Sequence, residues 1–231
     1  MDGTKPELSR SRIVAYVVIF PLVFAILLFL PAGTFDWLLG WLFFVVFLVL
    51  TLVSSLALWR LNPEIFDARR RIQPGTKGWD RIVASVVIVL FAVVPIVAAF
   101  ETARFGRAAL PGWVIVLGYL LLVAGFAGTA WAQVVNRFFE PGVRIQTERG
   151  HRVIDTGPYA LVRHPGYVAA FAMLAGMALA LGSAWALVPA AVAAALLVLR
   201  TAWEDSTLRA ELPGYADYAR RVRYRLLPGV W

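Results

Sequence analysis

The sequence predicts an all-α integral membrane protein of about six transmembrane helices, with the last two folded as a tight helical hairpin and with no Rossmann domain. Three observations lead to this prediction. Of the 231 residues, 61% are hydrophobic and only 16% are charged. The mean hydropathy of +0.75 is far from that of soluble domains. Uncharged stretches about as long as a membrane-crossing helix recur through the chain.

Four uncharged stretches predict four transmembrane helices in the first part of the chain. They cover residues 13–35, 37–59, 82–100 and 108–136, and each supplies the roughly 20 apolar residues that cross the hydrocarbon core. The first is longer than the apolar region of a usual signal peptide, and no small-residue cleavage site follows it cleanly. We therefore interpret it as a retained helix.

A fifth uncharged stretch, Tyr167 to Leu199, predicts the helical hairpin. Gly182 and Ser183 lie at its centre and divide it into two arms of about 16 residues each. At 1.5 Å per residue each arm is about 24 Å long, so the pair either spans a thinned bilayer or is re-entrant. Counting the arms as two gives six membrane helices.

The distribution of basic residues predicts the orientation. Of the 22 Lys and Arg residues, twenty fall on one side of the membrane in this topology, including Lys5, Arg10 and Arg12, whereas Arg104 and Arg107 fall on the other. Because cytoplasmic loops are enriched in Lys and Arg, both termini are predicted to be cytoplasmic. Arginines at helix ends beside anionic lipid account for the net charge of +8, and no nucleic-acid partner is required.

Polar chemistry is concentrated in the C-terminal part of the chain. Residues 1–136 form the predicted N-terminal region of four transmembrane helices and carry few reactive groups, whereas residues 137–231 hold both histidines, His151 and His164. We therefore expect function in residues 137–231. The absence of cysteine from the sequence excludes disulfides, thiolate metal sites and cysteine nucleophiles.

The segment GPYALVRHPGY, residues 157–167, interrupts the apolar pattern with two glycines and two prolines. Pro165 cannot continue a preceding helix through its own amide, and Gly166 loosens the backbone beside it. Such a break leaves backbone groups unpaired, and at membrane depth these groups need protein, water or a ligand. The segment is either a cradle for a polar ligand or a helix start with Arg163 and Tyr167 as interfacial anchors.

A second polar cluster follows the hairpin. Arg200 and Glu204 are four residues apart and share one face of a continuing helix, and Asp205 follows them. One interpretation is a simple helical ion pair. The other is functional, because a hairpin that begins at Tyr167 returns Arg200 and Glu204 to the membrane face of His164. Ionisable groups at the edge of an apolar bundle are costly unless they are paired or used.

The C-terminal tail, residues 211–231, interleaves Tyr215, Tyr218 and Tyr224 with several arginines. This composition is typical of an interfacial segment that binds lipid headgroups. The tail could instead fold over the site as a lid. A similar interleaving occurs in RNA-binding segments, but the tether to a membrane argues against that partner.

With these residues in view, the C-terminal half resembles the isoprenylcysteine carboxyl methyltransferase family of integral membrane methyltransferases, which is itself similar to phospholipid N-methyltransferases. The matching pattern covers about the last hundred residues, and its elements occur in order: His151 to Ile154, GPY, ArgHisProGlyTyr, a helical hairpin, Arg200 with Glu204 and Asp205, GlyTyr, Tyr218 and an Arg-rich segment that ends near Pro228. The first two or three helices carry no comparable signature.

The resemblance implies S-adenosylmethionine as cofactor, bound by the C-terminal segments rather than by a Rossmann domain. The sequence has no GxGxxG-type loop after a strand, in agreement. The implied cofactor contacts are Gln146, His151, Arg152, Val153, Ile154, Tyr159, His164, Pro165, Gly166, Tyr167 and Glu204. Arg200 is implied to face the substrate. The loop before His151 is shorter than in eukaryotic members, and Asp205 replaces the second of two usual glutamates.

The implied reaction is an in-line methyl transfer that needs alignment and exclusion of water but no metal. Arg200 and Glu204 are the implied catalytic residues. A guanidinium can hold a carboxylate, which is already ionised at pH 7, so Arg200 favours a carboxylate on a lipophilic membrane-resident acceptor. An amine such as phosphatidylethanolamine would first have to lose a proton, with Glu204 or a histidine as base and Arg200 on the lipid phosphate.

Two other classes of function remain open at this point. Some sterol reductases resemble this C-terminal architecture, in which case NADPH would replace S-adenosylmethionine. A non-enzymatic scaffold or transporter is the other, although transporters usually have related halves and polar groups near the bilayer midplane. The expected partners are a lipophilic or lipid-modified substrate and membrane lipids, with no nucleic acid and no obligatory protein partner.

Overall fold

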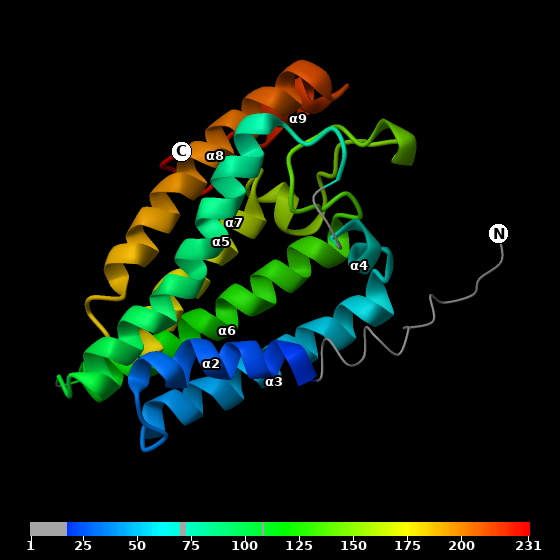
Figure 1. Ribbon diagram of the computed structural model, residues 1–231. Coiled ribbons are helices and arrows are strands. Elements are labelled where there is room, and N and C mark those ends of the chain that lie inside the picture. The colour runs from blue at the N-terminus through cyan, green and yellow to red at the C-terminus, as the bar shows by residue number, and fades with distance from the viewer. Residues whose placement is uncertain (1–17, 70–72, 108) are drawn as a thin grey trace.

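The computed structural model describes residues 18–69, 73–107 and 109–231. Within these residues every regular element is helical and none is a strand, which confirms the predicted all-α integral membrane fold. Lys5, Arg10, Arg12 and the first residues of the predicted 13–35 span lie outside the described residues. The long helices run side by side as a bundle, with the shorter elements gathered at one end (Figure 1).

Six helices of the described chain form this bundle. They are α2 (Phe20–Ala32), α3 (Leu38–Leu61), α5 (Gly78–Ala98) continued by the π-helix η2 (Ala99–Arg104), α6 (Gly112–Val135), α7 (Pro165–Ala180) and α8 (Leu187–Glu211). Four of them, α3, α5 with η2, α6 and α8, are long and apolar enough to cross a membrane, whereas α2 and α7 have 13 and 16 residues. The short elements are α4 (Glu64–Ala68), η3 (Thr147–Arg149), η4 (Gly157–Ala160) and α9 (Tyr215–Arg221).

The predicted hairpin is confirmed as α7 and α8, joined by a turn at Gly182. Gly182 has a φ of +70°, which a residue with a side chain rarely adopts, and its carbonyl accepts the amide of Leu110 at 3.0 Å. The hydroxyl of Ser183 donates to Glu101 of η2, and the amide of Trp185 donates to the same carboxylate at 3.0 Å. The turn is therefore fixed to the end of α5 through η2.

The second arm is longer than predicted. We expected it to end near Leu199, where charged residues begin, but α8 continues to Glu211. The helix continues because Arg200 and Asp205 on it are buried and paired with residues of other elements. Charges that would end a lipid-facing helix are tolerated where the protein supplies partners for them.

Close packing of α6 against α7 depends on glycine. A Cβ on Gly118 would lie 2.3 Å from the backbone nitrogen of Ala180, and one on Gly176 would lie 2.6 Å from that of Leu122. Neither position can accept a larger side chain without moving a helix, because the nearest atoms belong to the backbone. Small residues of this kind let membrane helices approach closely, and here they fix α7 beside α6.

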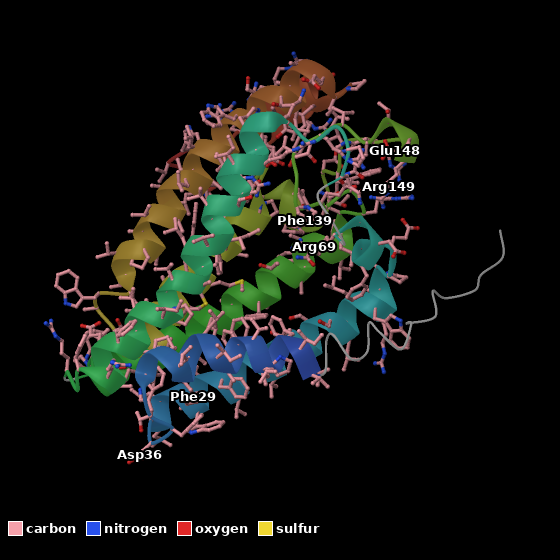
Figure 2. The ribbon with its side chains drawn as sticks, viewed as in Figure 1. Phe29, Asp36, Arg69, Phe139, Glu148 and Arg149 are labelled. Carbon is pink, nitrogen blue, oxygen red and sulfur yellow. The ribbon has the colours of Figure 1, made fainter. Side chains whose placement is uncertain are left out.

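The two ends of the bundle differ in character. The connections that follow α2, η2 and α7 meet at one end, where Arg104 also reaches the carbonyl of Pro31 at 3.5 Å. The other end carries α4, η3, η4 and α9. Figure 2 shows Phe29 and Asp36 toward the first end and Arg69, Phe139, Glu148 and Arg149 toward the second. Residues 137–164, the first part of the region 137–231 that is predicted to hold the function, lie at the second end.

Candidate active site

A cavity of about 360 Å³ lies at the second end of the bundle, within the size range of small-molecule sites. Eleven of the twelve residues predicted for the site line it: Gln146, His151, Arg152, Val153, Ile154, Tyr159, His164, Gly166, Tyr167, Arg200 and Glu204. Pro165, the twelfth, is buried at the first position of α7 and is not part of the lining. The loop at residues 146–159, the start of α7 and the C-terminal part of α8 thus line the same cavity.

Arg163 of the RHP motif is a buried clamp. Its Nε donates to Asp205 Oδ1 at 2.7 Å and its Nη2 to Oδ2 at 3.2 Å. Its Nη1 donates at 2.7 Å to the carbonyls of both Val222 and Arg223 in the tail. With 4% of its surface exposed, Arg163 is not the interfacial anchor that one interpretation expected.

Asp205 connects this clamp to the rest of the site. Its carboxylate is fully buried and also accepts from Tyr215 at 2.9 Å and from Arg209 and Arg225 at 3.0 Å. The Nε2 atom of His164 lies 3.5 Å from Asp205 Oδ1. One carboxylate therefore joins the start of α7, the end of α8 and the C-terminal tail.

The tail forms one wall of the cavity, as the lid alternative expected. The backbone amides of Arg163 and His164 donate at 3.0 Å to the carbonyls of Tyr224 and Arg225. Tyr218 donates to the carbonyl of Tyr159 at 2.7 Å, and both tyrosines line the cavity. Burial raises the pKa of the Tyr159 and Tyr218 phenols above their usual value, so both remain protonated at neutral pH.

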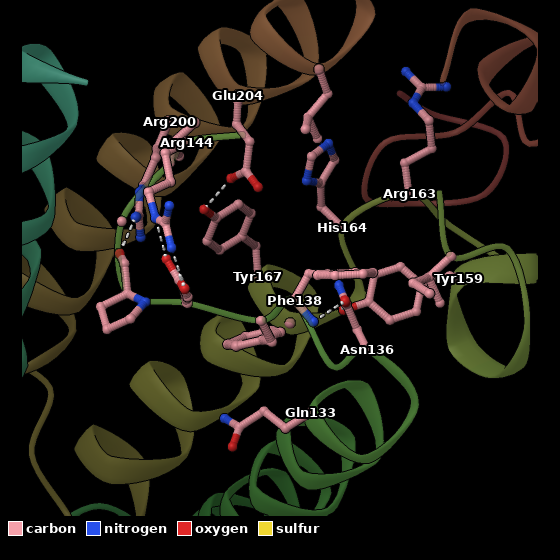
Figure 3. Close-up of a pocket in the computed structure, with 18 of the residues that line it drawn as sticks. Gln133, Asn136, Phe138, Arg144, Tyr159, Arg163, His164, Tyr167, Arg200 and Glu204 are labelled. Atoms are coloured by element: carbon pink, nitrogen blue, oxygen red, sulfur yellow. Dashed lines mark hydrogen bonds and ion pairs between the residues drawn. The ribbon is translucent and has the colours of Figure 1, made fainter. Parts of the chain in front are cut away.

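Glu204 and Tyr167 face each other across one side of the cavity, where the Tyr167 hydroxyl donates to the Glu204 carboxylate (Figure 3). The rings of His164 and Tyr167 stack with centroids 5.8 Å apart. The Arg200 guanidinium lies 5.5 Å from the centroid of the Tyr167 ring. A carboxylate, a guanidinium and stacked rings thus meet at one side of the cavity.

Arg200 is paired with a residue that the sequence analysis missed. Its Nε and Nη2 donate to the two oxygens of Asp80 on α5 at 2.7 and 3.1 Å, and Nη2 also donates to the carbonyl of Pro141 at 2.5 Å. The alternative of a helical ion pair with Glu204 is therefore wrong. Asp80, which is fully buried, also accepts the amide of Val143 at 2.7 Å. Asp80 lies two positions before the uncharged stretch 82–100, which was the available signal, but its partner Arg200 is 120 positions away.

The loop before η4 uses Gln146 for its own structure. The Gln146 side chain donates to the carbonyl of Phe138 at 2.7 Å and accepts from Arg149 at 2.7 Å, and the residue is only 2% exposed. Arg144 pairs with Glu140 at 2.8 Å and with Glu148 at 2.7 Å in the same loop. These bonds hold the loop in the shape that places His151 and the following residues at the cavity.

His151 is neutral in this loop. Burial, together with the positive charges of Arg144 and Arg149, lowers its pKa from the ordinary 6.5 to about 4. The neutral ring accepts the amide of Gln146 at Nδ1, 3.3 Å away, and packs on Phe138 with centroids 4.6 Å apart. A protonated ring could not accept that amide.

We expect stability to fall on acidification through this histidine. Because its folded-state pKa lies below the unfolded value, the unfolded chain binds more protons between pH 6.5 and about 4, and the free energy of unfolding decreases as the pH falls through that window. The measurement is thermal unfolding in detergent between pH 7.5 and 4. His151→Gln should flatten the upper part of the curve. A His151 ring that titrates near pH 6.5 by NMR would contradict the prediction.

The other part of the cavity is apolar and lies between the membrane helices. Its wall includes Val87 and Phe91 of α5, Met173 of α7 and Leu197 of α8. Gln133 of α6 is buried and also lines the cavity. The cavity thus has a charged, aromatic side formed by loop and tail and an apolar side formed by the bundle.

Nothing in the described ranges resembles a metal site. No group of three or more His, Cys, Asp or Glu side chains in this part of the chain is arranged to hold an ion. The acidic residues that line the cavity, and those that pair with its lining residues, are instead bonded to arginine or tyrosine. The carboxylates Asp80, Glu140, Glu204 and Asp205 all have such partners.

Comparison with known proteins gives a match to a family model and a similarity to one curated relative. The family model described as phospholipid methyltransferase matches residues 113–212, from the start of α6 to the end of α8. The cobalt-zinc-cadmium resistance protein CzcN of Cupriavidus metallidurans is 33% identical over 106 residues, which cover 45% of this chain and 47% of that protein. The chain therefore matches about half the length of this relative.

The family match includes every predicted site residue from Gln146 to Glu204. It also includes the arginine and aspartate of the clamp, Arg163 and Asp205, and the hairpin turn at Gly182. The resemblance inferred from the sequence motifs is therefore confirmed over the region that surrounds the cavity. Residues 113–212, less than half of the chain, are thus similar to the phospholipid methyltransferase family of membrane methyltransferases.

Proposed function

We propose that this protein transfers a methyl group from S-adenosylmethionine to a carboxylate on a lipophilic, membrane-resident acceptor. The observation that carries the proposal is the two-sided cavity, in which charged and aromatic residues of the loop, α7 and tail meet an apolar space between α5, α6, α7 and α8. A polar cofactor and an oily acceptor require this combination. An acceptor dissolved in the bilayer can reach such a site sideways, between membrane helices.

The residues present fit this cofactor. Glu204 offers a carboxylate to an amino group, and the rings of Tyr159, His164 and Tyr167 offer faces to a purine or a sulfonium. Gly166 permits the tight wall behind them, because a Cβ there would lie 2.7 Å from the Phe139 ring. When bound, S-adenosylmethionine supplies a methyl group on a positively charged sulfur that leaves as a neutral thioether.

The protein's own groups then align the reactants and exclude water. Arg200 presents its Nη1 to the acceptor, because its Nε and Nη2 are held by Asp80 and Pro141, and no described residue accepts from Nη1. A carboxylate bound to this guanidinium is already ionised, so the transfer needs no general base. The tail closes the polar side of the cavity against solvent.

A second candidate is N-methylation of a phospholipid amine. The contact between Arg200 and Asp80 favours this candidate. Two of the three guanidinium nitrogens are occupied, so Arg200 cannot form a two-pronged bond to a substrate carboxylate. Its Nη1 alone can still bind a phosphate oxygen. Glu204 would then accept the ammonium proton. A pH–rate profile with a basic limb near neutrality would favour this candidate over the carboxylate.

The same cavity guides our proposal for orientation and partners. The arginine-rich loop and tail lie at the cavity end of the bundle, so we assign that end, and both termini, to the cytoplasm. The partners are then a lipophilic or lipid-modified substrate and the surrounding lipids, without nucleic acid or an obligatory protein partner. Accessibility of a single introduced cysteine at Asp217 of α9 or at Asp36 tests the assignment in membrane vesicles, because α9 and Asp36 lie at opposite ends of the bundle.

Cofactor binding is the direct test of the proposed function. We expect purified protein in detergent to bind S-adenosylmethionine and its demethylated product, measured by titration calorimetry, and Glu204→Gln to weaken both by about tenfold or more, since a charge-assisted hydrogen bond is lost. Glu211→Gln is the matched control, because Glu211 lies on the same helix and pairs with Lys77 at the surface.

The alternatives predict other outcomes of this titration. Binding of NADPH in place of the sulfur nucleosides would favour a membrane reductase, and binding of neither by well-folded protein would favour a scaffold or transporter. If the cofactor binds, radiolabelled methyl offered with a total lipid extract should mark the acceptor. Label released by mild alkali indicates a methyl ester, whereas stable label in a phospholipid headgroup indicates the amine.

A further inference from the structure

Gln133 places an unpaired amide in the apolar side of the cavity. The residue is 6% exposed, it lines the cavity, and no described residue donates to or accepts from its side chain. Its backbone carbonyl is used separately, by Asn62 Nδ2 at 2.6 Å. Figure 3 shows Gln133 on the α6 side of the cavity, across from Glu204 and Tyr167 and without a bond to any residue drawn.

The neighbouring polar residues of α6 do have partners. Thr129, one turn earlier, directs its hydroxyl to the sulfur of Met173 at 3.7 Å. Asn136, one turn later, donates to the Tyr159 hydroxyl at 3.1 Å and accepts the amide of Phe138 at 2.9 Å. Gln133 lies between Thr129 and Asn136 on the face of α6 toward the cavity. Unlike theirs, its side chain has no hydrogen-bond partner among the described residues and can bind a ligand.

An available amide at this position is costly without a ligand. Burying a polar group with no hydrogen bond costs about 1–3 kcal/mol, and an apolar side chain such as leucine at this position would not carry that penalty. Water can satisfy the amide while the cavity is empty and can leave when a ligand supplies the same bonds. The amide is thus placed to bind a group that enters the cavity.

We infer that Gln133 is a specificity-determining residue that binds a neutral carbonyl or hydroxyl group of the methyl acceptor. This inference rests on the proposed function, because it places the acceptor in the apolar side of the same cavity. The amide both donates and accepts, so it matches a neutral polar group. Charged groups are matched on the opposite side, where Glu204, Arg200 and Arg144 line the cavity.

The acceptor therefore carries two polar groups on an otherwise apolar molecule. One is the reacting group near Arg200 and Glu204, and the other is the neutral group that reaches Gln133 across the cavity. The cofactor contacts predicted from the sequence lie on the loop, α7 and α8, whereas Gln133 belongs to α6. Replacing the Gln133 side chain should consequently weaken binding of the acceptor and leave the affinity for the cofactor unchanged.

The test compares acceptor analogues that differ in one neutral group. For the acid class, the pair is S-farnesyl-N-acetylcysteine and S-farnesylmercaptopropionic acid, which lacks the acetamide. For the amine class, it is diacyl phosphatidylethanolamine and its dialkyl ether analogue, which lacks the ester carbonyls. Wild-type protein should prefer the carbonyl-bearing member of the methylated pair by about three- to tenfold in kcat/KM, the value of one hydrogen bond. Gln133→Leu should reduce that preference to about one.

Two thermal-unfolding measurements show whether Gln133→Leu is folded and whether it binds the acceptor, without relying on catalytic turnover. Thermal unfolding of Gln133→Leu without ligand should occur at the wild-type temperature or above it, because no bond is lost. In the presence of the demethylated cofactor, the carbonyl-bearing probes should stabilise the wild type more than the variant. Thr129→Val is the matched control and should keep the wild-type preference, because its hydroxyl already has a partner.

Three outcomes would overturn the inference. The first is a preference of Gln133→Leu for the carbonyl-bearing acceptor that equals that of the wild type. The second is a loss of affinity for the cofactor in Gln133→Leu as large as its loss of affinity for the acceptor. The third is that none of the four probes stabilises the wild type. Failure of the proposed function has a different signature, since it appears as absence of cofactor binding in the calorimetric titration of the wild type.

Discussion

Replacing Asp205 by alanine is expected to destabilise the protein by about 3–5 kcal/mol, because it leaves the buried guanidinium of Arg163 without its counter-charge. Arg209, Arg225 and Tyr215 lose a partner at the same time. Thermal or denaturant unfolding in detergent measures the loss. Because Arg163 also holds the carbonyls of the tail, the tail should detach before the bundle unfolds.

Detachment of the tail has its own readout. Trypsin should cleave after Arg220 or Arg221 faster in Asp205→Ala than in the wild type, at a temperature where both keep their helix content. Asp217→Ala is the matched control, because Asp217 pairs with Arg220 on the exposed surface, where such a pair contributes about 0–1 kcal/mol. Equal unfolding of the two variants would show that Asp205 does not hold the site together.

Replacing Asp80 by alanine should have an effect of similar size on stability and a larger one on acceptor turnover. The substitution leaves Arg200 buried without its carboxylate and removes the acceptor for the Val143 amide, at a cost of about 3–5 kcal/mol. Arg200 would then be free to turn away from the acceptor. We therefore expect kcat for methylation to fall while the affinity for S-adenosylmethionine, measured by calorimetry, changes little.

A double variant separates the charge effect from simple loss of packing. Asp80→Asn with Arg200→Gln leaves no unpaired charge, so it should unfold at a higher temperature than Asp80→Asn alone, which leaves the Arg200 guanidinium without its carboxylate. Its methylation activity should nevertheless stay low, since the guanidinium is gone. A double variant no more stable than Asp80→Asn alone would mean that Asp80 does not stabilise the protein through the charge of Arg200.

Much of the fold follows from elementary properties of the sequence. Uncharged stretches of membrane-crossing length predict the helices, because a backbone in lipid must satisfy its own hydrogen bonds. Gly182 and Ser183 predict the hairpin turn. The hairpin returns Arg200 and Glu204 to the level of His164, which is why the predicted site residues meet at one cavity. The division of the chain at residue 136 stays a prediction. From the part before it, Gln133 lines the cavity and Asp80 holds the lining residue Arg200.

The pairing of charges could not be predicted from local sequence. The spacing of Arg200 and Glu204 suggested a bond within one helix, but helix packing places Asp80 closer. Arg163 resembled a residue that reaches for lipid headgroups, and its burial depends on the tail folding back over it. Gln133 gave no signal, because a single amide in an apolar run looks the same whether it faces a neighbouring helix, lipid or a cavity.

The ion pair between Asp80 and Arg200 has a consequence for biogenesis. Its acidic member is synthesised 120 residues before its basic member, so α5 must enter the membrane with an aspartate that has no partner yet. A carboxylate at the centre of an inserting helix costs about 2.5–3.5 kcal/mol, and Asp80 avoids much of this because it lies in the first turn. Chains interrupted before α8 should therefore remain incompletely assembled and become targets of membrane quality control.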